Sequence, residues 1–551
     1  MTLFYILLFT LLSFNSWAVI PHKNEIDKIF AEFDKSDVPG ASLGVIKNGK
    51  LIYARGYGMA NLEYGIPNDE KSVFRIGSTS KQFTAACIVL LYQKGKLKLT
   101  DSLDKFFPEF PDYAKKVTIQ HLLNHTSGIR DYLTLALFKG LRMDDYFDDK
   151  EVMHWLVKQQ NLNFIPGEEF VYSNSGYWLL GQIVNKVAEM SMAEFAEQEI
   201  FKPLGMTHTH FQNDHNLIVK NRASGYSPKG EDDFKINMTT LNMIGDGGIF
   251  TTIEDILLWD NAYYQSKVLN KEFWHVMTKK GQLNNSEAID YAAGLYIEDY
   301  KGLKTINHGG EFVGFRAELL RFPEQHVSIA LFFNRSDADP SGMAFRVADI
   351  LLKDDFINSH HEKPKAVKKI DLENTLIYTL NQLIGDYQVN PGVVLEFTIQ
   401  GKRLHAHQSW NDKSYDLERI NKNMYRIPDD TDIDFTFTEL KDSFTQMLII
   451  HQNGRDSDWK RKGVINKSKI NLNDYTGEFY SPDLETTYTL YLKENQLYIR
   501  TKNKEMGELT IEGNDKFSVG PNELVFVREE NKVSAVTVNA GRVKNLKFDK
   551  L

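Results

Sequence analysis

The stretch "FRIGSTSKQFTAACIVLLYQ", residues 74–93, places a serine and a lysine three positions apart at the start of a long apolar run. The run continues to Leu91 and stops at Gly95, which predicts a helix that begins at Ser78. Because nearly all sides of this helix are apolar, we expect it to lie buried at the centre of a domain. Cys87, the single cysteine of the chain, falls inside this helix, so the sequence predicts a buried thiol and no internal disulfide.

Expected strands lie before this helix in the sequence, and helices and further strands follow it. Residues 41–46 and 51–56 predict a hairpin around an Asn48-Gly49 turn, and residues 72–76 predict a short strand. Residues 99–265 are mainly helical in pattern, strands return between residues 291 and 335, and a last helix is expected over residues 342–352. This order predicts an α/β fold in which an antiparallel sheet is flanked by helices and carries a helical subdomain.

The amino terminus has the pattern of a secretory signal peptide. An apolar run over residues 3–14 is followed by Ser16-Trp17-Ala18, which has the small-x-small form of a cleavage site. We therefore expect a signal peptide over residues 1–18 and an exported protein, periplasmic or secreted; a buried terminal helix or strand is the alternative. No other stretch approaches the ~20 apolar residues of a membrane span, so no stable span is expected after signal removal. The net charge of -9 and the lack of a long basic run argue against a nucleic-acid partner.

The last third of the chain has a different pattern. Residues 358–369 are polar and charged and are interpreted as a linker. Beyond them, a unit of close to ninety residues occurs twice, and Gly385-Asp386-Tyr387 in the first copy matches Gly477-Glu478-Phe479 in the second. The short alternating segments predict two small antiparallel β-barrels, over residues 370–465 and 466–551, with one larger sandwich as the alternative.

The spacing of Ser78 and Lys81 permits two interpretations. Residues three apart share a helix face, so the Lys81 amine can approach the Ser78 hydroxyl. A buried lysine is driven towards its neutral form, which can accept the proton of a nucleophilic serine. Alternatively, Ser78 caps the helix and Lys81 points at solvent. The motif by itself does not decide between the two.

Two further motifs favour the catalytic interpretation. "EEFVYSNSGY" contains Tyr172-x-Asn174, and in an extended loop two such side chains point to the same side. Tyr172 can then share a proton with the serine and the lysine. "TINHGGEFVGF" contains His308-Gly309-Gly310 on an expected strand, where the glycines permit the close approach of a substrate backbone.

In this order, the three motifs resemble those of the serine β-lactamase-related superfamily. They are most similar to the branch with class C β-lactamases, D-Ala-D-Ala carboxypeptidases, D-aminopeptidases and esterases (peptidase family S12). Supporting stretches that resemble this branch are "HLLNHTSGIRDY", "PLGMTHT" and "GDGGIFTTIEDILLWDNAY". The resemblance covers roughly residues 27–352 and implies a β-lactamase/transpeptidase-like domain over residues 19–357. A catalytic domain followed by two small barrels is similar to the D-aminopeptidase arrangement.

The resemblance implies a mechanism without a metal or an organic cofactor. Ser78 would attack a carbonyl and form an acyl-enzyme, and Lys81 and Tyr172 would share the general base and acid work. The backbone N–H groups of Ser78 and Glu311 would form the oxyanion hole. Asn174 would position a substrate amide. Which of the lysine and the tyrosine is the base stays open.

The third motif of the superfamily is altered in this chain. His308 stands where class C β-lactamases have lysine, and Gly309 stands where a threonine is usual, while Gly310 is kept. We expect this segment to bind substrate, but a neutral imidazole supplies no fixed charge for a carboxylate. Neither Ser-Asp-Asn nor Lys-Thr-Gly occurs in the chain. Their absence argues against the class A type of β-lactamase, and the altered third motif argues against efficient β-lactam hydrolysis.

The sequence therefore predicts an exported serine hydrolase that cleaves an amide, a peptide, including D-amino-acid-containing peptides, or an ester. The alternative is a non-catalytic penicillin-binding-like protein that binds a cell-wall or protein partner. A lipase-type hydrolase is disfavoured because no Gly-x-Ser-x-Gly elbow occurs. The expected partner is a small substrate, and contact with cell-wall peptide is a further expectation. The sequence does not indicate the oligomeric state or the role of the barrels.

Overall fold

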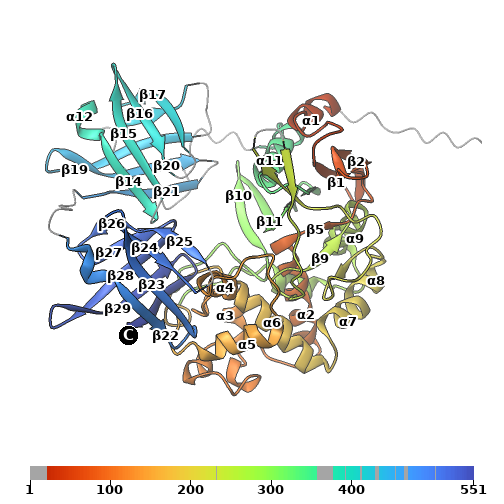
Figure 1. The fold of residues 1–551 in the computed structure, drawn as a ribbon. Helices are drawn as coiled ribbons and strands as arrows, with labels where there is room; N and C mark the ends of the chain where they lie inside the picture. The colour runs from red at the N-terminus through yellow and green to blue at the C-terminus, as the bar shows by residue number, and fades with distance from the viewer. Residues whose placement is uncertain are drawn as a thin grey trace, which may run out of the picture.

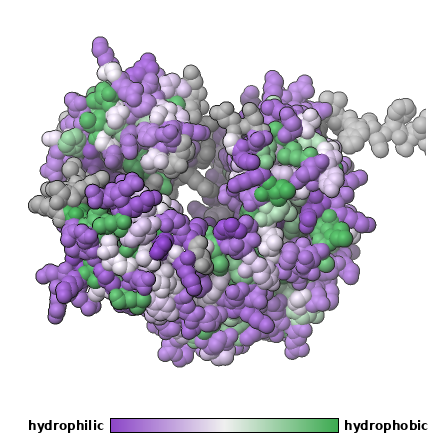
Figure 2. All heavy atoms as spheres, in the orientation of Figure 1, coloured by the Kyte–Doolittle hydropathy of each residue, from purple (hydrophilic) through white to green (hydrophobic). Residues whose placement is uncertain are grey.

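The structure is a computed structural model that describes residues 22–230, 233–356, 377–390, 393–409, 412–428, 433–452, 455–463, 470–502 and 504–551. The expected signal peptide and linker lie outside the described residues. Figure 1 shows the expected hydrolase domain, called the catalytic domain from here on, which contains a sheet and a helical part, with two β modules beside it. The face shown in Figure 2 is mainly hydrophilic, and its apolar side chains are scattered. Within the described ranges, the helices are too short or too polar to cross a membrane.

A six-stranded antiparallel sheet forms the centre of the catalytic domain. Its strand order is β10-β11-β12-β13-β1-β2. The strands are β1 (Ala41–Lys47), β2 (Lys50–Tyr57), β10 (Tyr296–Tyr300), β11 (Leu303–Phe312), β12 (Phe315–Phe322) and β13 (Val327–Phe333). β1 pairs along its whole length with β13, from Ala41 opposite Phe333 to Lys47 opposite Val327. This pairing joins the two ends of the domain and confirms the predicted sheet.

Helices cover both faces of the sheet, which is why every residue of β13 is buried. α1 (Lys23–Ile29) and α11 (Pro340–Leu351) pack over one face. α9 (Ile253–Gln265) covers the other, where Gly44 lets it approach closely: a Cβ at this glycine would lie 2.3 Å from Ile253 Cγ2. The layered arrangement of helices on an antiparallel sheet is the predicted fold class.

The helical part surrounds one buried helix, α2 (Lys81–Gln93). Every residue of α2 from Lys81 to Leu91 is buried, and α6 (Asn174–Ala188) and α10 (Lys271–Met277) pack against it. The remaining helices include α3 (Ile119–Leu123), α4 (Tyr132–Phe138), α5 (Asp149–Lys158), α7 (Met192–Ala196) and α8 (Lys202–Leu204). The helix at residues 81–93 is therefore as central as its apolar pattern indicates.

Two predicted boundaries differ from the structure. The helix does not begin as an α-helix at Ser78: a 3₁₀ turn, η1 (Gly77–Ser80), precedes α2. The strand expected over residues 72–76 is only β5 (Phe74–Arg75), which pairs with β9 (Ile249–Thr251). Gly77, whose φ of 51° turns the chain sharply out of the strand, accounts for the end of the strand and for the 3₁₀ turn. At the start of the strand, Val73 forms an isolated bridge with Arg222 instead of pairing with β9.

The C-terminal third forms two separate antiparallel modules, so the single-sandwich alternative is wrong. Module 1 is a closed barrel of strands β14 (Gly385–Asn390), β15 (Val393–Gln400), β16 (Arg403–Gln408), β17 (Lys413–Asn421), β18 (Met424–Arg426), β19 (Ile433–Lys441), β20 (Phe444–Gln452) and β21 (Arg455–Arg461). Module 2 is a nearly closed sheet of strands β22 (Gly477–Ser481), β23 (Thr486–Lys493), β24 (Gln496–Arg500), β25 (Glu505–Glu508), β26 (Thr510–Gly513), β27 (Lys516–Val519), β28 (Asn522–Glu529), β29 (Lys532–Ala540) and β30 (Val543–Lys550). The first strand pairs with the last in each module, and Gly385 and Gly477 both begin that first strand with positive φ.

The two modules differ in their cores. The buried residues of module 1 form a cluster of their own, around Phe397 and Phe437. Those of module 2, including Phe479 and Phe548, belong to the same buried cluster as α2 and α6. Module 2 is therefore packed into the catalytic domain.

Candidate active site

The 3₁₀ turn η1 and the first turn of α2 bring Ser78 and Lys81 together. Lys81 Nζ lies 3.1 Å from Ser78 Oγ, 2.9 Å from Asn174 Oδ1 and 2.6 Å from the carbonyl oxygen of Asp246. Lys81 is fully buried, whereas Ser78 is half-buried and lines a cleft. The alternative in which Lys81 points at solvent is therefore wrong.

The environment of Lys81 favours its neutral form. Burial of the amine is the main cause, and it lowers the pKa of Lys81 to about 7. The negative charge of Asp246 acts in the opposite direction, and the guanidinium of Arg542 adds to the lowering. Near neutral pH, Lys81 is therefore present to a substantial fraction as the neutral amine.

The ring of Tyr172 packs against the Lys81 amine. The centre of its ring is 4.9 Å from Lys81 Nζ, and the ring of His125 packs on it with centroids 4.1 Å apart. The phenol oxygen is buried and has no hydrogen-bond partner within the described part of the chain. Burial raises the pKa of Tyr172 well above its ordinary value, and the nearby Ser78 hydroxyl offsets part of that rise. Tyr172 therefore keeps its proton at neutral pH.

Asn174 is positioned differently from the expected extended loop. It is the first residue of α6, because Asp131 Oδ2 accepts a hydrogen bond from its backbone N–H at 2.7 Å. Its side-chain oxygen is held by Lys81, and Asn174 itself lines the cleft. The helix start depends on a partner more than forty residues away, which a local pattern does not reveal.

His308 lies on β11 and lines the cleft, with both ring nitrogens engaged. Nδ1 lies 2.5 Å from the carbonyl oxygen of Gly309, so this nitrogen carries the hydrogen, and Nε2 accepts from the Tyr291 hydroxyl at 3.0 Å. Burial, reinforced by the charge of Lys81, lowers the pKa of His308 to about 3. The imidazole is therefore neutral, as the sequence predicts, and contributes no charge to the cleft.

β11 passes close to the Ser78 turn because of two glycines. A Cβ at Gly310 would lie 2.0 Å from the carbonyl oxygen of Ile76, and one at Gly77 would lie 2.8 Å from the backbone nitrogen of Glu311. Thr79 also donates to the carbonyl oxygen of His308 at 3.0 Å. The Glu311 N–H expected in an oxyanion hole is thus beside the turn that carries the serine.

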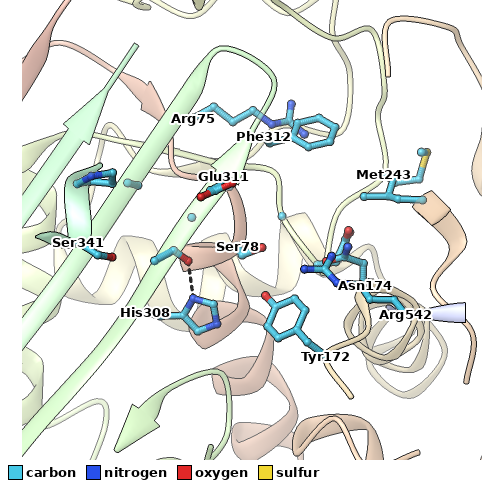
Figure 3. Close-up of a pocket in the computed structure, with 18 of the residues that line it drawn as sticks. Arg75, Ser78, Tyr172, Asn174, Met243, His308, Glu311, Phe312, Ser341 and Arg542 are labelled. Carbon is cyan, nitrogen blue, oxygen red and sulfur yellow. Dashed lines mark hydrogen bonds between the residues drawn. The ribbon is translucent and has the colours of Figure 1, made fainter. Parts of the chain in front are cut away.

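Ser78, Tyr172, Asn174 and His308 line a single cleft of about 700 Å³, shown in Figure 3. Ser78 lies at its centre, between β11 and the segment that bears Tyr172 and Asn174. The three motifs therefore converge, together with Gly309, Gly310 and Glu311, in the same lining.

Several residues of the site were not singled out from the sequence. Asp246 accepts from the Tyr132 hydroxyl at 3.0 Å, and His125 accepts from the Ser173 N–H at 3.1 Å. His125, Asp131 and Asp246 lie in the stretches "HLLNHTSGIRDY" and "GDGGIF", so the sequence contained a signal for them. Arg542, which also lines the cleft, comes from module 2 and had no such signal.

Comparison with known proteins agrees with this geometry. The family described as Beta-lactamase matches residues 26–352, which is more than half of the chain. The chain belongs to this family. The match confirms the resemblance drawn from the three motifs and places the chain among serine hydrolases of the β-lactamase fold.

Two curated relatives of this Beta-lactamase family member are penicillin-binding protein 4* of Bacillus subtilis and a D-aminopeptidase of Gluconobacter oxydans. The first is 29% identical over 377 residues, which cover 65% of this chain and 81% of that protein. The second is 26% identical over 300 residues, covering 54% of this chain and 56% of that protein. The chain thus matches little more than half of the D-aminopeptidase's length.

Solved structures extend the fold likeness beyond the catalytic domain. The octameric penicillin-binding protein homologue from Pyrococcus abyssi aligns with a TM-score of 0.54 and 24% identity, covering 88% of this chain and 98% of that chain. A D-amino acid amidase from Ochrobactrum anthropi SV3 aligns with a TM-score of 0.51 and 23% identity, covering 60% of this chain and 98% of that chain. Because 88% of the chain exceeds the catalytic domain, the first likeness reaches into the β modules.

Proposed function

We propose that this protein is an exported serine hydrolase that forms an acyl-enzyme on Ser78. Its substrates are amides, peptides, including D-amino-acid-containing and cell-wall peptides, or esters. The observation that carries the proposal is the buried Lys81 amine, which lies within hydrogen-bond distance of Ser78 Oγ. Export to the periplasm or the medium rests on the apolar segment at residues 3–14.

The contacts of Lys81 suit a neutral amine that acts as a base. Asn174 Oδ1 and the carbonyl oxygen of Asp246 are acceptors, and a neutral amine has two N–H groups to give them. Its lone pair is then left for the Ser78 hydroxyl at 3.1 Å. This is the arrangement that general base catalysis requires.

In acylation, the Ser78 proton passes to Lys81 Nζ while Oγ forms a bond to the substrate carbonyl carbon. Negative charge then develops on the carbonyl oxygen, where the N–H groups of Ser78 and Glu311 stabilise it. Tyr172, whose pKa is raised, gives its proton to the leaving nitrogen or oxygen as that bond breaks, and Lys81 returns a proton to the phenolate. The amine or alcohol departs and the acyl-enzyme remains.

Water completes the cycle by the same route. Lys81 accepts a proton from the water as the water oxygen attacks the acyl carbon, and the proton returns to Ser78 Oγ as the ester bond breaks. The carboxylic acid is released and the amine is neutral again. Asn174 and the segment of His308, Gly309 and Gly310 hold the substrate along β11, with the imidazole as a neutral wall of the cleft.

An active-site-directed probe tests the proposal. A fluorophosphonate should label the wild-type protein covalently at Ser78, and Ser78→Ala should not be labelled. Peptide mapping by mass spectrometry locates the adduct, and circular dichroism verifies that both proteins are folded. A folded wild-type protein that stays unlabelled, and that also fails to react with a labelled penicillin, would favour the non-catalytic binding function instead.

A substrate panel then identifies the bond that is cleaved. We expect turnover of 4-nitrophenyl esters, D-alanyl amides or D-Ala-D-Ala peptides, and slow turnover of nitrocefin. The expectation for nitrocefin follows from the uncharged His308, which supplies no cation on β11 at the position where class C β-lactamases have a lysine. Rapid nitrocefin hydrolysis would contradict it.

A further inference from the structure

The hairpin between β29 and β30 brings a residue of module 2 to the catalytic cleft. Ala540 pairs with Val543, so Gly541 and Arg542 form its two-residue turn. Arg542 lines the cleft together with Ser78 and Tyr172, although more than 360 residues separate it from either. Figure 3 shows its side chain beside Asn174 and Tyr172.

The backbone of this turn is fixed by the catalytic domain. The carbonyl oxygen of Arg542 accepts hydrogen bonds from Asn163 Nδ2 at 2.9 Å and from the Asp131 N–H at 3.3 Å. Asn163 Oδ1 in turn accepts from the Lys544 N–H at 2.7 Å. Because Asp131 also holds the N–H of Asn174, the hairpin and the catalytic asparagine share one anchor.

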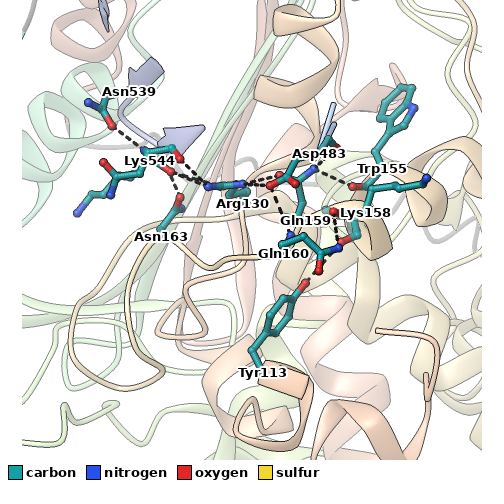
Figure 4. Close-up of polar contacts among 12 residues, drawn as sticks. Tyr113, Arg130, Trp155, Lys158, Gln159, Gln160, Asn163, Asp483, Asn539 and Lys544 are labelled. Atoms are coloured by element: carbon teal, nitrogen blue, oxygen red, sulfur yellow. Dashed lines mark hydrogen bonds and ion pairs between the residues drawn. The ribbon is translucent and has the colours of Figure 1, made fainter. Parts of the chain in front are cut away.

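A buried arginine also holds the hairpin through hydrogen bonds, as Figure 4 shows. Arg130, whose side chain is 1% exposed, donates to the carbonyl oxygens of Lys544 and Asn545 and to Asp483 Oδ2 at 3.0–3.3 Å. Its remaining contact is Gln159 Oε1 at 2.8 Å. A buried cation with several acceptors on the hairpin makes this interface specific in register.

The guanidinium of Arg542 is left available for a ligand. Its carbon lies 4.9 Å from the centre of the Tyr172 ring, so the planar group stacks on the phenol. Within the described ranges, no hydrogen bond or ion pair engages its nitrogens. The five N–H groups of an arginine form a planar fork that matches a carboxylate.

The other charged groups that line the cleft are acidic or lie away from Tyr172. Asp246 accepts from Tyr132, and Asp339 caps α11 by accepting from the Gly342 N–H. Arg75 is buried beside the ring of Phe312, 5.0 Å from its centre, away from Tyr172. Glu311 points to solvent, with its side chain 78% exposed. Arg542 is therefore the fixed positive charge at the Tyr172 end of the cleft.

We propose that Arg542 is a specificity-determining residue that binds a carboxylate of the substrate. It supplies, from module 2, the fixed cation that the uncharged His308 does not provide on β11. The substrate class is an acyl compound that carries a carboxylate within reach of the scissile bond. This inference rests on the proposed hydrolase function of the same cleft.

Three esters that share one reactive bond test it. The first is 4-nitrophenyl hexanoate, which is neutral. The second is mono-4-nitrophenyl adipate, with a carboxylate on the acyl side, and the third is 3-carboxy-4-nitrophenyl hexanoate, with a carboxylate on the leaving group. In Arg542→Gln, we expect kcat/KM for at least one carboxylated ester to fall roughly 10- to 100-fold, the range for a lost charge-assisted bond. The neutral ester should change less than about threefold.

Two further variants separate charge recognition from general effects. Lys544→Gln removes a positive charge two residues away, from a side chain that pairs with Glu169 at 2.7 Å and does not line the cleft. This control should leave all three esters unchanged. Arg542→Lys should recover part of the lost preference, because it restores the charge without the planar fork. Measurement at pH 8.5, with spontaneous hydrolysis subtracted, keeps Lys81 neutral in every variant.

The outcomes distinguish the two proposals. If the wild-type protein hydrolyses none of the esters and Ser78 is not acylated, the hydrolase function fails, and this inference fails with it. If the wild type is active but Arg542→Gln slows all three esters equally, Arg542 acts only by packing on Tyr172 and carboxylate recognition is overturned. An unchanged ratio between charged and neutral esters overturns it as well.

Discussion

The two β modules arise from one repeated sequence pattern, yet they relate to the catalytic domain in different ways. Module 1 encloses its own core around Phe397 and Phe437, whereas the core of module 2 is continuous with that of the catalytic domain. Module 2 also contributes Arg542 to the cleft. The repeat therefore gives two similar folds, of which one contributes a residue to the candidate active site.

The difference depends on a few polar contacts at one hairpin. The residues that hold the β29–β30 turn are Arg130, Asp131 and Asn163, and all three lie in the helical part of the catalytic domain. Module 1, by contrast, contacts module 2, and this contact includes an ion pair of Lys462 with Glu512 at 2.7 Å. We therefore expect the catalytic domain and module 2 to behave as one cooperative unit and module 1 to unfold separately.

The largest effect on activity should come from a substitution in the cleft itself, and the effects of substitutions in the two modules can be compared with it. Lys81→Met removes the general base while it keeps the aliphatic volume, so kcat/KM for a neutral ester should fall by about 10²–10⁴-fold. The melting temperature should change little, because a buried amine is replaced by an apolar side chain. Steady-state kinetics and differential scanning calorimetry measure the two quantities.

A control for this variant is available at the other end of the same helix. Lys94 follows α2 and pairs with Glu199 at 2.5 Å, with both side chains exposed. Lys94→Met should therefore keep wild-type kinetics. If Lys81→Met instead unfolds the protein or keeps its activity, Lys81 has a structural role and the mechanism is wrong.

The next largest effect concerns the attachment of module 2. Arg130→Ala leaves Asp483 and two carbonyl groups without their buried partner, and loss of one member of a buried ion pair costs about 3–5 kcal/mol. We expect the shared transition of the catalytic domain and module 2 to move to lower temperature, with activity lost in parallel. The transition of module 1 should stay in place.

An exposed ion pair across the same interface provides the comparison for Arg130. Lys158 pairs with Glu485 at 3.0 Å, and their side chains are 45% and 39% exposed. Lys158→Ala should cost less than about 1 kcal/mol, because solvent screens such pairs. Equal destabilisation by the two variants would show that burial does not govern this interface.

The pH dependence of the reaction tests the proton arrangement in the cleft. The pKa of Lys81 is lowered to about 7, and the base must be neutral. Below that pKa, kcat/KM for the neutral ester should fall about tenfold per pH unit, and above it the rate should reach a plateau. His308, with a pKa lowered to about 3, stays neutral over this range and adds no second limb. A rate that rises up to pH 10 would mean that Lys81 keeps an ordinary pKa.

The sequence predicted the parts of this molecule that depend on local chemistry. The buried helix follows from the apolar run after Ser78, and the contact between Ser78 and Lys81 follows from their spacing. The two β modules follow from the repeat. The family resemblance predicts that Tyr172, Asn174 and His308 lie in the same cleft, and in the structure all three line it.

Features that depend on docking between distant segments were not predictable. Asn174 begins a helix because Asp131 accepts its N–H, and no local pattern encodes this partner. In the sequence, nothing distinguishes Arg542 from the other arginines, and it lies against Tyr172 only because module 2 packs on the catalytic domain. A hairpin turn of two residues has the same sequence pattern whether it faces solvent or a cleft.

The smallest expected effect tests the independence of module 1. Arg461 closes this barrel: it donates from Nε to the carbonyl oxygen of Thr445 at 2.6 Å and from Nη2 to the Tyr387 hydroxyl at 3.2 Å. Arg461→Ala should destabilise module 1 by roughly 1–3 kcal/mol, since buried acceptors lose their donor. Because the core of module 1 is separate, kcat/KM should stay within about twofold of wild type for the neutral and carboxylated esters alike. Calorimetry should show only the module 1 transition shifted. A loss of activity in this variant would mean that module 1 supports the cleft through module 2, and the two modules would then differ in degree rather than in kind.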